Sequence, residues 1–327
     1  MRLKRHGTQK VIRPMGLVAP VALVTLGVAV PGAAVSPEGA MAGSEQAELR
    51  PAVATSGPRG GTGARATRVD FNPRESRLRY GQVAEFDFNP EDIKAERDFG
   101  REVAAHLLGR YALDESSELN RYLSLVGKNL AEWANRPEIE FHVGVLDSDA
   151  VSAFAAPGGY IFVSRGALRL MRDEAELAGV LGHEIIHVTE RHIVHELDIR
   201  GGESGVVSGL ARIIGGSGDP ARAAFSQAVD QAMAILLEEG LSQEDELEAD
   251  SLGTFLATQA GYDPRGLPRF LERIASRDSG EREDILANTH PPYATRLSSL
   301  GGFLADNDLD ELEQPRLEER FQQHVAR

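Results

Sequence analysis

The sequence contains no cysteine among its 327 residues. This excludes disulfide bonds, thiolate metal ligands, a cysteine nucleophile and an acylated lipoprotein cysteine. A transition-metal site in this chain must therefore be built from His, Asp and Glu side chains.

Basic residues are outnumbered by acidic ones. The chain has 35 Lys and Arg against 50 Asp and Glu, which gives a formal net charge of −15 at pH 7. Because a chain this acidic repels phosphate backbones, we expect no nucleic-acid partner. The length allows one sizeable globular domain with extensions, or two small domains, and we find no internal repeat.

A long apolar stretch near the N-terminus lies between a basic segment and a segment of small residues. This order, over residues 1–42, is typical of a secretory signal peptide, and Ala40-Met41-Ala42 offers one A-x-A cleavage site. The main alternative is an uncleaved anchor that keeps residues 15–35 at a membrane. An organelle transit peptide is a weaker alternative, because the apolar core is continuous. We expect export to the bacterial periplasm or the extracytoplasmic face of the membrane.

Apolar periodicity predicts two helices, followed by strands. One helix begins near Pro90, and a second carries the apolar positions from Leu119 to Leu130. Residues 138–147 alternate apolar and polar like a strand. Residues 150–170, with the turn Pro157-Gly158-Gly159, predict a hairpin-like pair of strands.

Three further helices are predicted downstream. Asp173 has the form of an N-cap and predicts a helix that runs to about Ile199. Ser242 opens a second helix that ends at Gly261, and a third covers about 265–276. Seven glycines occur within residues 200–220. This segment is interpreted either as a lid or plug or as a plain flexible loop.

Residues 182–188 read LGHEIIH and are the strongest chemical signal. On a helix, residues four apart differ by about 40° and one turn, so His183 and His187 can bind one Zn²⁺ through neutral imidazoles. Glu184 is rotated by about 100° from His183 and can reach a water without being a ligand, as a general base requires. The motif also arises by chance, so two ordinary buried histidines are the alternative.

A zinc site of this kind needs a third ligand. The same helix does not supply one: a metzincin would have His at 193, where this chain has Ile, and on a continuous helix His192 points about 180° from His183. We expect Glu246, on the following helix, to bind the metal, and Asp250, four residues later, to orient a ligand imidazole. The alternative is a solvated acidic helix start.

The motifs together resemble a known family. HEIIH followed by ELEAD is preceded by SAFAAPGGYIFVSRGAL and followed by AGYDP and THPPYATRL. This set is similar to the zinc metalloendopeptidases that include HtpX, the periplasmic protease BepA, the mitochondrial OMA-type proteases and the CAAX prenyl endopeptidases. It spans roughly residues 91–301 in the family's order and looks like the small periplasmic members, without a helical-repeat domain. Ser152 departs from an Asn that is frequent in the family, which puts a hydrogen bond near the substrate strand in doubt.

The resemblance implies the fold and the metal. We expect a mainly helical α+β, zincin-like domain over residues 91–304, with a small sheet beside the active-site helix. A flexible lead-in at 43–90 precedes it, and an acidic C-terminal tail at 305–327 follows it. The expected cofactor is one Zn²⁺ per chain, and its expected ligands are His183, His187 and Glu246.

Further site residues follow from the same resemblance. Arg296 is a candidate for holding the oxyanion or a substrate carbonyl, and His290 for approaching the metal and regulating access. A structural turn at His290 and a surface ion pair at Arg296 are the alternatives. An extended substrate is expected to pair with an edge strand at residues 160–164. The expected substrate-binding residues are Gly158, Gly159, Tyr160, Ile161 and Phe162.

The expected function is hydrolysis of peptide bonds in unfolded or misassembled envelope proteins, with Glu184 as the general base. The competing hypothesis is a non-catalytic chaperone or adaptor for misfolded envelope proteins, in which zinc is structural. Glu184 favours hydrolysis, because a structural site has no use for a base there. The sequence does not indicate an oligomeric state.

Overall fold

The computed structural model describes residues 90–197, 218–277 and 285–325, which all belong to one compact unit, Thr62–Arg327. The expected leader at 1–42, the lead-in up to residue 89 and residues 200–217 of the glycine-rich segment lie outside the described residues. Among the helices that are described, none combines the length and the apolar character needed to cross a membrane.

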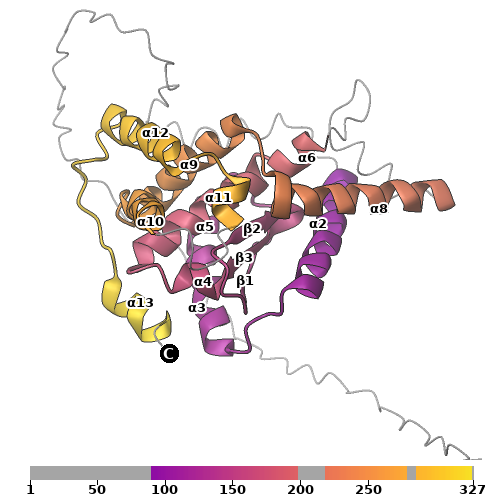
Figure 1. The fold of residues 1–327 in the computed structure, drawn as a ribbon, viewed down its shortest axis with the longest axis horizontal. Coiled ribbons are helices and arrows are strands. Elements are labelled where there is room, and N and C mark those ends of the chain that lie inside the picture. The colour runs from indigo at the N-terminus through magenta and orange to yellow at the C-terminus, as the bar shows by residue number, and fades with distance from the viewer. Residues whose placement is uncertain (1–89, 198–217, 278–284, 326–327) are drawn as a thin grey trace, which may run out of the picture. The chain divides into compact units, whose positions relative to one another are not determined.

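Helices make up most of the described chain, which confirms the expected mainly helical α+β class. They surround a small sheet, with α9, α10 and α12 drawn on one side of α5 and with α2 and α8 on the other (Figure 1). Their bounds are α2 Pro90–Arg110, α3 Ser117–Ala131, α4 Arg165–Leu168, α5 Glu174–Thr189, α6 His192–Glu196, α8 Asp219–Ala234, the π-helical turn η4 Ile235–Glu239, α9 Gln243–Gln259, α10 Gly266–Ala275, α11 Ile285–Thr289, α12 Tyr293–Asp306 and α13 Glu318–Val325.

The sheet has three strands in the order β1-β3-β2, with bounds β1 His142–Leu146, β2 Ala153–Ala156 and β3 Tyr160–Ser164. Strand β3 runs antiparallel to β2 and parallel to β1. The hairpin between β2 and β3 is confirmed, and its turn places Gly158 and Gly159 at φ 72° and 100°, where a side chain would be strained. The expected edge position of residues 160–164 is wrong, because β3 is the central strand.

Helix α5 is the centre of the fold, and every residue from Glu174 to Val188 is buried. It begins as predicted, since the Asp173 side chain accepts a hydrogen bond from the amide of Glu176 at 2.9 Å. The predicted extension to about Ile199 is wrong. The helix ends at Thr189, Arg191 adopts a left-handed conformation at φ 57°, and the separate helix α6 begins at His192.

Two glycines let α5 and α9 approach closely. A Cβ added to Gly253 on α9 would lie 2.5 Å from the backbone nitrogen of His183, and one added to Gly182 on α5 would lie 2.5 Å from the carbonyl oxygen of Gly253. Neither side chain would fit, so the contact depends on their absence. Helix α9 begins as predicted, with the Ser242 hydroxyl accepting from the amide of Asp245. The closest contact therefore joins the middle of α9, at Gly253, to the middle of α5, at Gly182 and His183.

Candidate metal centre

Side chains from α5 and α9 converge on one buried point. Nε2 of His183 and Nε2 of His187 lie 3.0 Å apart. The carboxylate of Glu246 faces both rings, with Oε2 3.5 Å from Nε2 of His183 and Oε1 3.7 Å from Nε2 of His187. All three side chains are almost fully buried. The structure thus brings together the three residues expected to be ligands.

These donors fit a zinc ion. Oε2 of Glu246 is buried and makes no hydrogen bond of good geometry with the described residues, although Nε2 of His290 and Nε2 of His183 lie 3.2 and 3.5 Å away. A cation between these atoms would resolve this arrangement. Two ligands about 2.0–2.1 Å from a tetrahedral zinc are separated by roughly 3.4 Å, and the observed separations of 3.0 to 3.7 Å bracket this value. Imidazole nitrogens and a carboxylate are also ligand types that zinc prefers.

Asp250 and Arg296 lie behind His183. Oδ1 of Asp250 is 3.0 Å from Nδ1 of His183, on the side of the ring opposite the metal-facing nitrogen. Burial raises the pKa of Asp250, but the Arg296 guanidinium outweighs this effect and holds the pKa far below its usual range. For His183, burial acts in the opposite direction and lowers the pKa, because it disfavours the charged imidazolium. The neighbouring carboxylates of Asp250 and Glu246 outweigh this effect and raise the pKa of His183 to about 9. Asp250 therefore stays ionised and can orient the ring.

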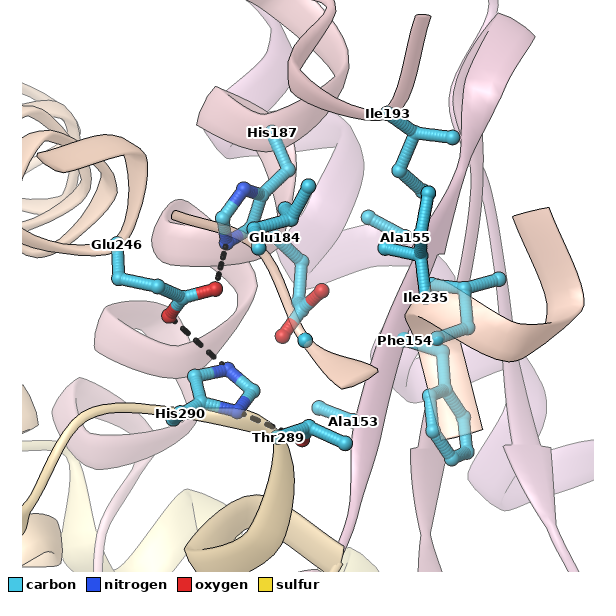
Figure 2. Close-up of a pocket in the computed structure, with 13 residues that line it drawn as sticks. Ala153, Phe154, Ala155, Glu184, His187, Ile193, Ile235, Glu246, Thr289 and His290 are labelled. Atoms are coloured by element: carbon cyan, nitrogen blue, oxygen red, sulfur yellow. Dashed lines mark hydrogen bonds and ion pairs between the residues drawn. The ribbon is translucent and has the colours of Figure 1, made fainter. Parts of the chain in front are cut away.

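Glu184 projects beside the donor group and is not part of it. Its carboxylate points into the space between His187 and His290 on one side and Ala153 and Ala155 of strand β2 on the other (Figure 2). Burial raises its pKa to about 7, with the neighbouring Glu246 charge acting in the same direction. A carboxylate with a pKa near neutrality can both accept and release a proton at physiological pH.

His290 approaches the same point from the end of α11. Its Nε2 lies 3.2 Å from Oε2 of Glu246, and its Nδ1 is 2.9 Å from the hydroxyl of Thr289. These contacts are drawn as dashed lines in Figure 2. His183, His187, Glu246 and His290 each place one donor atom within 4.8 Å of the others. Burial lowers the pKa of His290 to about 4, which keeps its ring neutral.

A pocket opens from the donor group towards β2 and the turn η4. Its polar side is formed by Glu184, His187, Glu246, Thr289 and His290, and its other side is mostly apolar. The apolar lining comes from Ala153, Phe154, Ala155, Ile193, Ile235, Leu236 and Leu241. A peptide could therefore lie with a carbonyl at the polar side and a side chain at the apolar side.

Two expectations about this site need correction. Arg296 does not face the pocket: it is 2% exposed and is bound to Asp250 behind His183, so the geometry does not support an oxyanion-holding role. The expected substrate-binding residues, Gly158, Gly159, Tyr160, Ile161 and Phe162, do not line the pocket either. Because β3 is paired on both sides, the strand beside the pocket is β2.

One further residue, which the sequence indicated to be a surface or second-layer residue and not a ligand, lies directly behind His187. His192 was expected to point away from the metal, yet its Nδ1 lies 2.9 Å from Nδ1 of His187. The expectation assumed a continuous helix, and the break at Arg191 turns His192 back. Neither glycine nor proline marks this break, so the local sequence carries no signal for it.

Three donors of the types that zinc prefers, beside a buried carboxylate that is not one of them, are the arrangement expected of a metallopeptidase. Comparison with known proteins agrees with this class. The family model described as peptidase family M48 matches residues 117–303, more than half of the chain. The chain belongs to peptidase family M48.

Its relatives include proteases from bacteria and mitochondria. The beta-barrel assembly-enhancing protease of Escherichia coli (strain K12) is 30% identical over 212 residues, which cover 63% of this chain and 43% of that protein. The mitochondrial metalloendopeptidase OMA1 of Schizosaccharomyces pombe is 27% identical over 73% of this chain and 68% of its own length. The metalloprotease YcaL of Escherichia coli is 30% identical over 62% and 73%. The chain thus spans less than half the length of the first of these relatives.

Proposed function

We propose that this protein is a zinc-dependent endopeptidase in which His183, His187 and Glu246 hold the metal and Glu184 is the general base. The observation that carries the proposal is the convergence of the three donors from two helices, with Glu184, His187 and Glu246 lining one side of a pocket. A bound zinc ion supplies a Lewis acid that acidifies water and polarises a peptide carbonyl.

The protein's own groups then handle the proton and the substrate. The Glu184 carboxylate accepts a proton from the attacking water and returns it to the leaving amine. Asp250 keeps Nε2 of His183 directed at the metal by binding the opposite side of the ring. The apolar wall of the pocket excludes water from the reacting groups, which strengthens the electrostatic interactions there.

Strand β2 is the element that we propose to align the substrate. The amide of Ser164 donates to the carbonyl of Ser152, and bonding alternates along an antiparallel pair, so the backbone groups of Ala153 and Ala155 point away from β3. The carbonyl of Val151, on the same outer side, accepts from the amides of Ile285 and Leu286 in α11. No described strand pairs with the outer side of β2. An extended peptide could pair there, which favours unfolded segments.

We further propose that the substrates are unfolded or misassembled proteins of a bacterial envelope. The likeness to a protein named for its role in beta-barrel assembly supports this, as does the signal-peptide pattern of residues 1–42. The protein would then act in quality control outside the cytoplasm.

The position of His290 favours a second candidate function. Four protein donors around one ion would close the site to water, which suits a structural zinc in a chaperone or adaptor, or a latent enzyme. Replacing His290 with Ala separates these cases. An enzyme held latent by this ring gains cleavage activity, whereas a protein with a purely structural zinc does not.

The deciding experiment compares the protein with its Glu184→Gln form. Zinc per chain is measured first, and then the cleavage of casein as an unfolded protein. We expect about one zinc in both forms and cleavage only by the unchanged protein. The matched control is Glu196→Gln, which removes the same charge from an exposed position on α6 and should leave both readouts unchanged. Absence of zinc from the unchanged protein would overturn the proposal at its first step.

A further inference from the structure

His187 has a partner on the side of its ring that faces away from the metal centre. Its Nε2 faces His183 and Glu246, while its Nδ1 lies 2.9 Å from Nδ1 of His192. The two rings are nearly perpendicular, at 75°, with centroids 5.0 Å apart. His192 is only 3% exposed. Its second nitrogen, Nε2, lies 3.2 Å from Oε2 of Glu248 on α9. The three side chains therefore form a chain of contacts that leads from the ligand towards the surface.

The backbone turn that brings His192 to this position is held by an ion pair with the buried carboxylate of Glu96. Arg191 adopts its left-handed conformation while its Nε donates to Oε2 of Glu96 at 3.1 Å. Arg136 binds the same oxygen at 3.0 Å and also donates to the carbonyl of Val188 near the end of α5. A left-handed conformation is unfavourable for a residue with a side chain, and such strain clusters at functional sites.

The helix break has a specific consequence for His192. On an uninterrupted helix, residues five apart differ by about 140°, so His192 could not meet the outer side of the His187 ring. With the break at Arg191, the two rings make direct contact. The strained turn is therefore coupled to the orientation of a metal ligand.

Proton counting determines the direction of the hydrogen bonds. A neutral imidazole carries one proton. When Nε2 of His187 coordinates a cation, its proton is on Nδ1, so Nδ1 of His192 must accept it. The proton of His192 is then on Nε2, where it can be donated to Glu248. In this arrangement every donor faces an acceptor: Nδ1 of His187 donates to Nδ1 of His192, and Nε2 of His192 donates to the carboxylate of Glu248.

We propose that His192 and Glu248 are positioning residues for the ligand His187: they fix the tautomer and the orientation of its ring for metal binding. The inference rests on the proposed function, because it assumes that His187 is a ligand. In this proposal, the rings of His183 and His187 are oriented by different kinds of group. His183 is backed directly by the carboxylate of Asp250, and His187 is backed by a neutral ring that is in turn held by Glu248.

The alternative for the same residues is a second cation site. His192, Asp245 and Glu248 each offer a donor atom within 4.8 Å of the others. A cation on Nε2 of neutral His192 would force the proton of that ring onto Nδ1. It would then face the Nδ1 proton of His187 across 2.9 Å. Two donors cannot share this contact, so a zinc on His187 disfavours a cation on His192.

The test measures the zinc dissociation constant of the full chain by competition with a chelator. His192→Phe keeps the ring and removes both nitrogens, and we expect it to weaken zinc binding by about 10–100-fold. His192→Asn places an amide oxygen where Nδ1 was, and it should recover most of this loss. With Co²⁺ in place of zinc, the visible absorption bands should change in His192→Phe and return towards the original in His192→Asn, because they report ligand geometry.

Glu248 provides a second pair of variants that does not endanger folding, since its side chain is 50% exposed. Glu248→Ala should weaken zinc binding by several-fold, and Glu248→Gln, which keeps an acceptor for His192, should restore it. The matched control on the same helix is Glu244→Ala, an exposed acid that should change neither zinc binding nor the Co²⁺ spectrum.

The outcomes separate this inference from the proposed function. If the unchanged protein binds no zinc, the proposed function fails, and this inference fails with it. If it binds zinc tightly and the His192 and Glu248 variants bind equally well, only the positioning role is overturned. Two cations per chain, with the second lost in Glu248→Ala, would establish the second-site alternative instead.

Discussion

Arg296 holds Asp250 through two hydrogen bonds, in which Nε donates to Oδ2 at 2.9 Å and Nη2 donates to Oδ1 at 2.6 Å. Both side chains are almost completely buried, and Oδ1 of the same carboxylate faces His183. If His183 binds zinc as proposed, Arg296 holds the carboxylate that orients this ligand, so a residue outside the pocket should influence metal binding.

The first prediction concerns Arg296→Gln. Asp250 would be left as a buried charge without its partner, which we expect to lower the free energy of unfolding by about 3–5 kcal/mol. Zinc affinity should fall by about 10–100-fold, because the carboxylate behind His183 is released. Urea unfolding and chelator competition measure the two effects. As a control, Arg169→Gln breaks an exposed ion pair with Asp149 and should cost less than about 1 kcal/mol. Unchanged zinc affinity in Arg296→Gln would refute the positioning role.

The second prediction concerns the glycine contact between α5 and α9. In Gly253→Ala, the new Cβ meets the backbone of His183, which cannot move aside as a side chain could. The helices must separate, so we expect a destabilisation of about 1–3 kcal/mol and weaker zinc binding, as Glu246 moves from the histidines. Gly301→Ala is the matched control, because it also lies in a helix but faces open space. Because alanine has a higher helix propensity than glycine, Gly301→Ala should stabilise the protein by up to about 1 kcal/mol. Equal effects of the two substitutions would contradict the close-contact argument.

Local signals in the sequence predicted much of this fold. The caps at Asp173 and Ser242 begin α5 and α9 where expected, because a cap is a contact between residues three apart. The apolar spacing from Leu119 to Leu130 likewise matches the buried face of α3. The donor set followed from spacing within α5 and from the need for a third ligand. These features depend on neighbours in the chain, which a single sequence displays directly.

The errors concern features set by distant residues. The end of α5 depends on Glu96 and Arg136, which precede Arg191 by many residues and bind it or the helix end only in the folded state. The strand order β1-β3-β2 is also a tertiary property, since the hairpin pattern alone does not reveal which strand β1 will join. Arg296 was misplaced for the same reason: its buried partner, Asp250, lies on another helix.

The third prediction concerns the C-terminal helix α13, which packs beside the start of α5. Phe321 is 1% exposed within the main core, and Arg320 binds the carboxylate of Glu174, the first residue of α5. That carboxylate also accepts hydrogen bonds from the hydroxyls of Tyr122 and Tyr262. Phe321→Ala should therefore lower the free energy of unfolding by about 3–5 kcal/mol.

Gln323→Ala is the control for this helix, because Gln323 is exposed and close in sequence. It should change the stability by no more than about 0.5 kcal/mol. Urea unfolding monitored by circular dichroism measures both variants. If the two unfold at the same urea concentration, the C-terminal segment does not contribute to the stability of the catalytic domain.

The last prediction is a pH dependence that originates away from the metal centre. Asp263 is buried and accepts hydrogen bonds from Arg265, Arg269 and Arg316. Burial raises the pKa of its carboxyl, but the arginines outweigh this effect and hold the pKa below its ordinary value of 3.8. A folded-state pKa below the unfolded one means that the ionised carboxylate stabilises the fold. This contribution is complete above about pH 3.8 and is lost as the pH falls through the folded-state pKa.

Comparison of the protein with Asp263→Asn isolates this contribution from other acidic groups. At pH 7 the variant should be less stable by about 2 kcal/mol, because the arginines lose a charged acceptor. The difference in free energy of unfolding should stay constant from about pH 7 to pH 5 and narrow below about pH 3.8, where the unchanged protein also loses the charge. Asp149→Asn, at an exposed position, should show little difference at any pH. A stability difference that stays the same or widens in acid would mean that the arginines do not hold Asp263 in its ionised form.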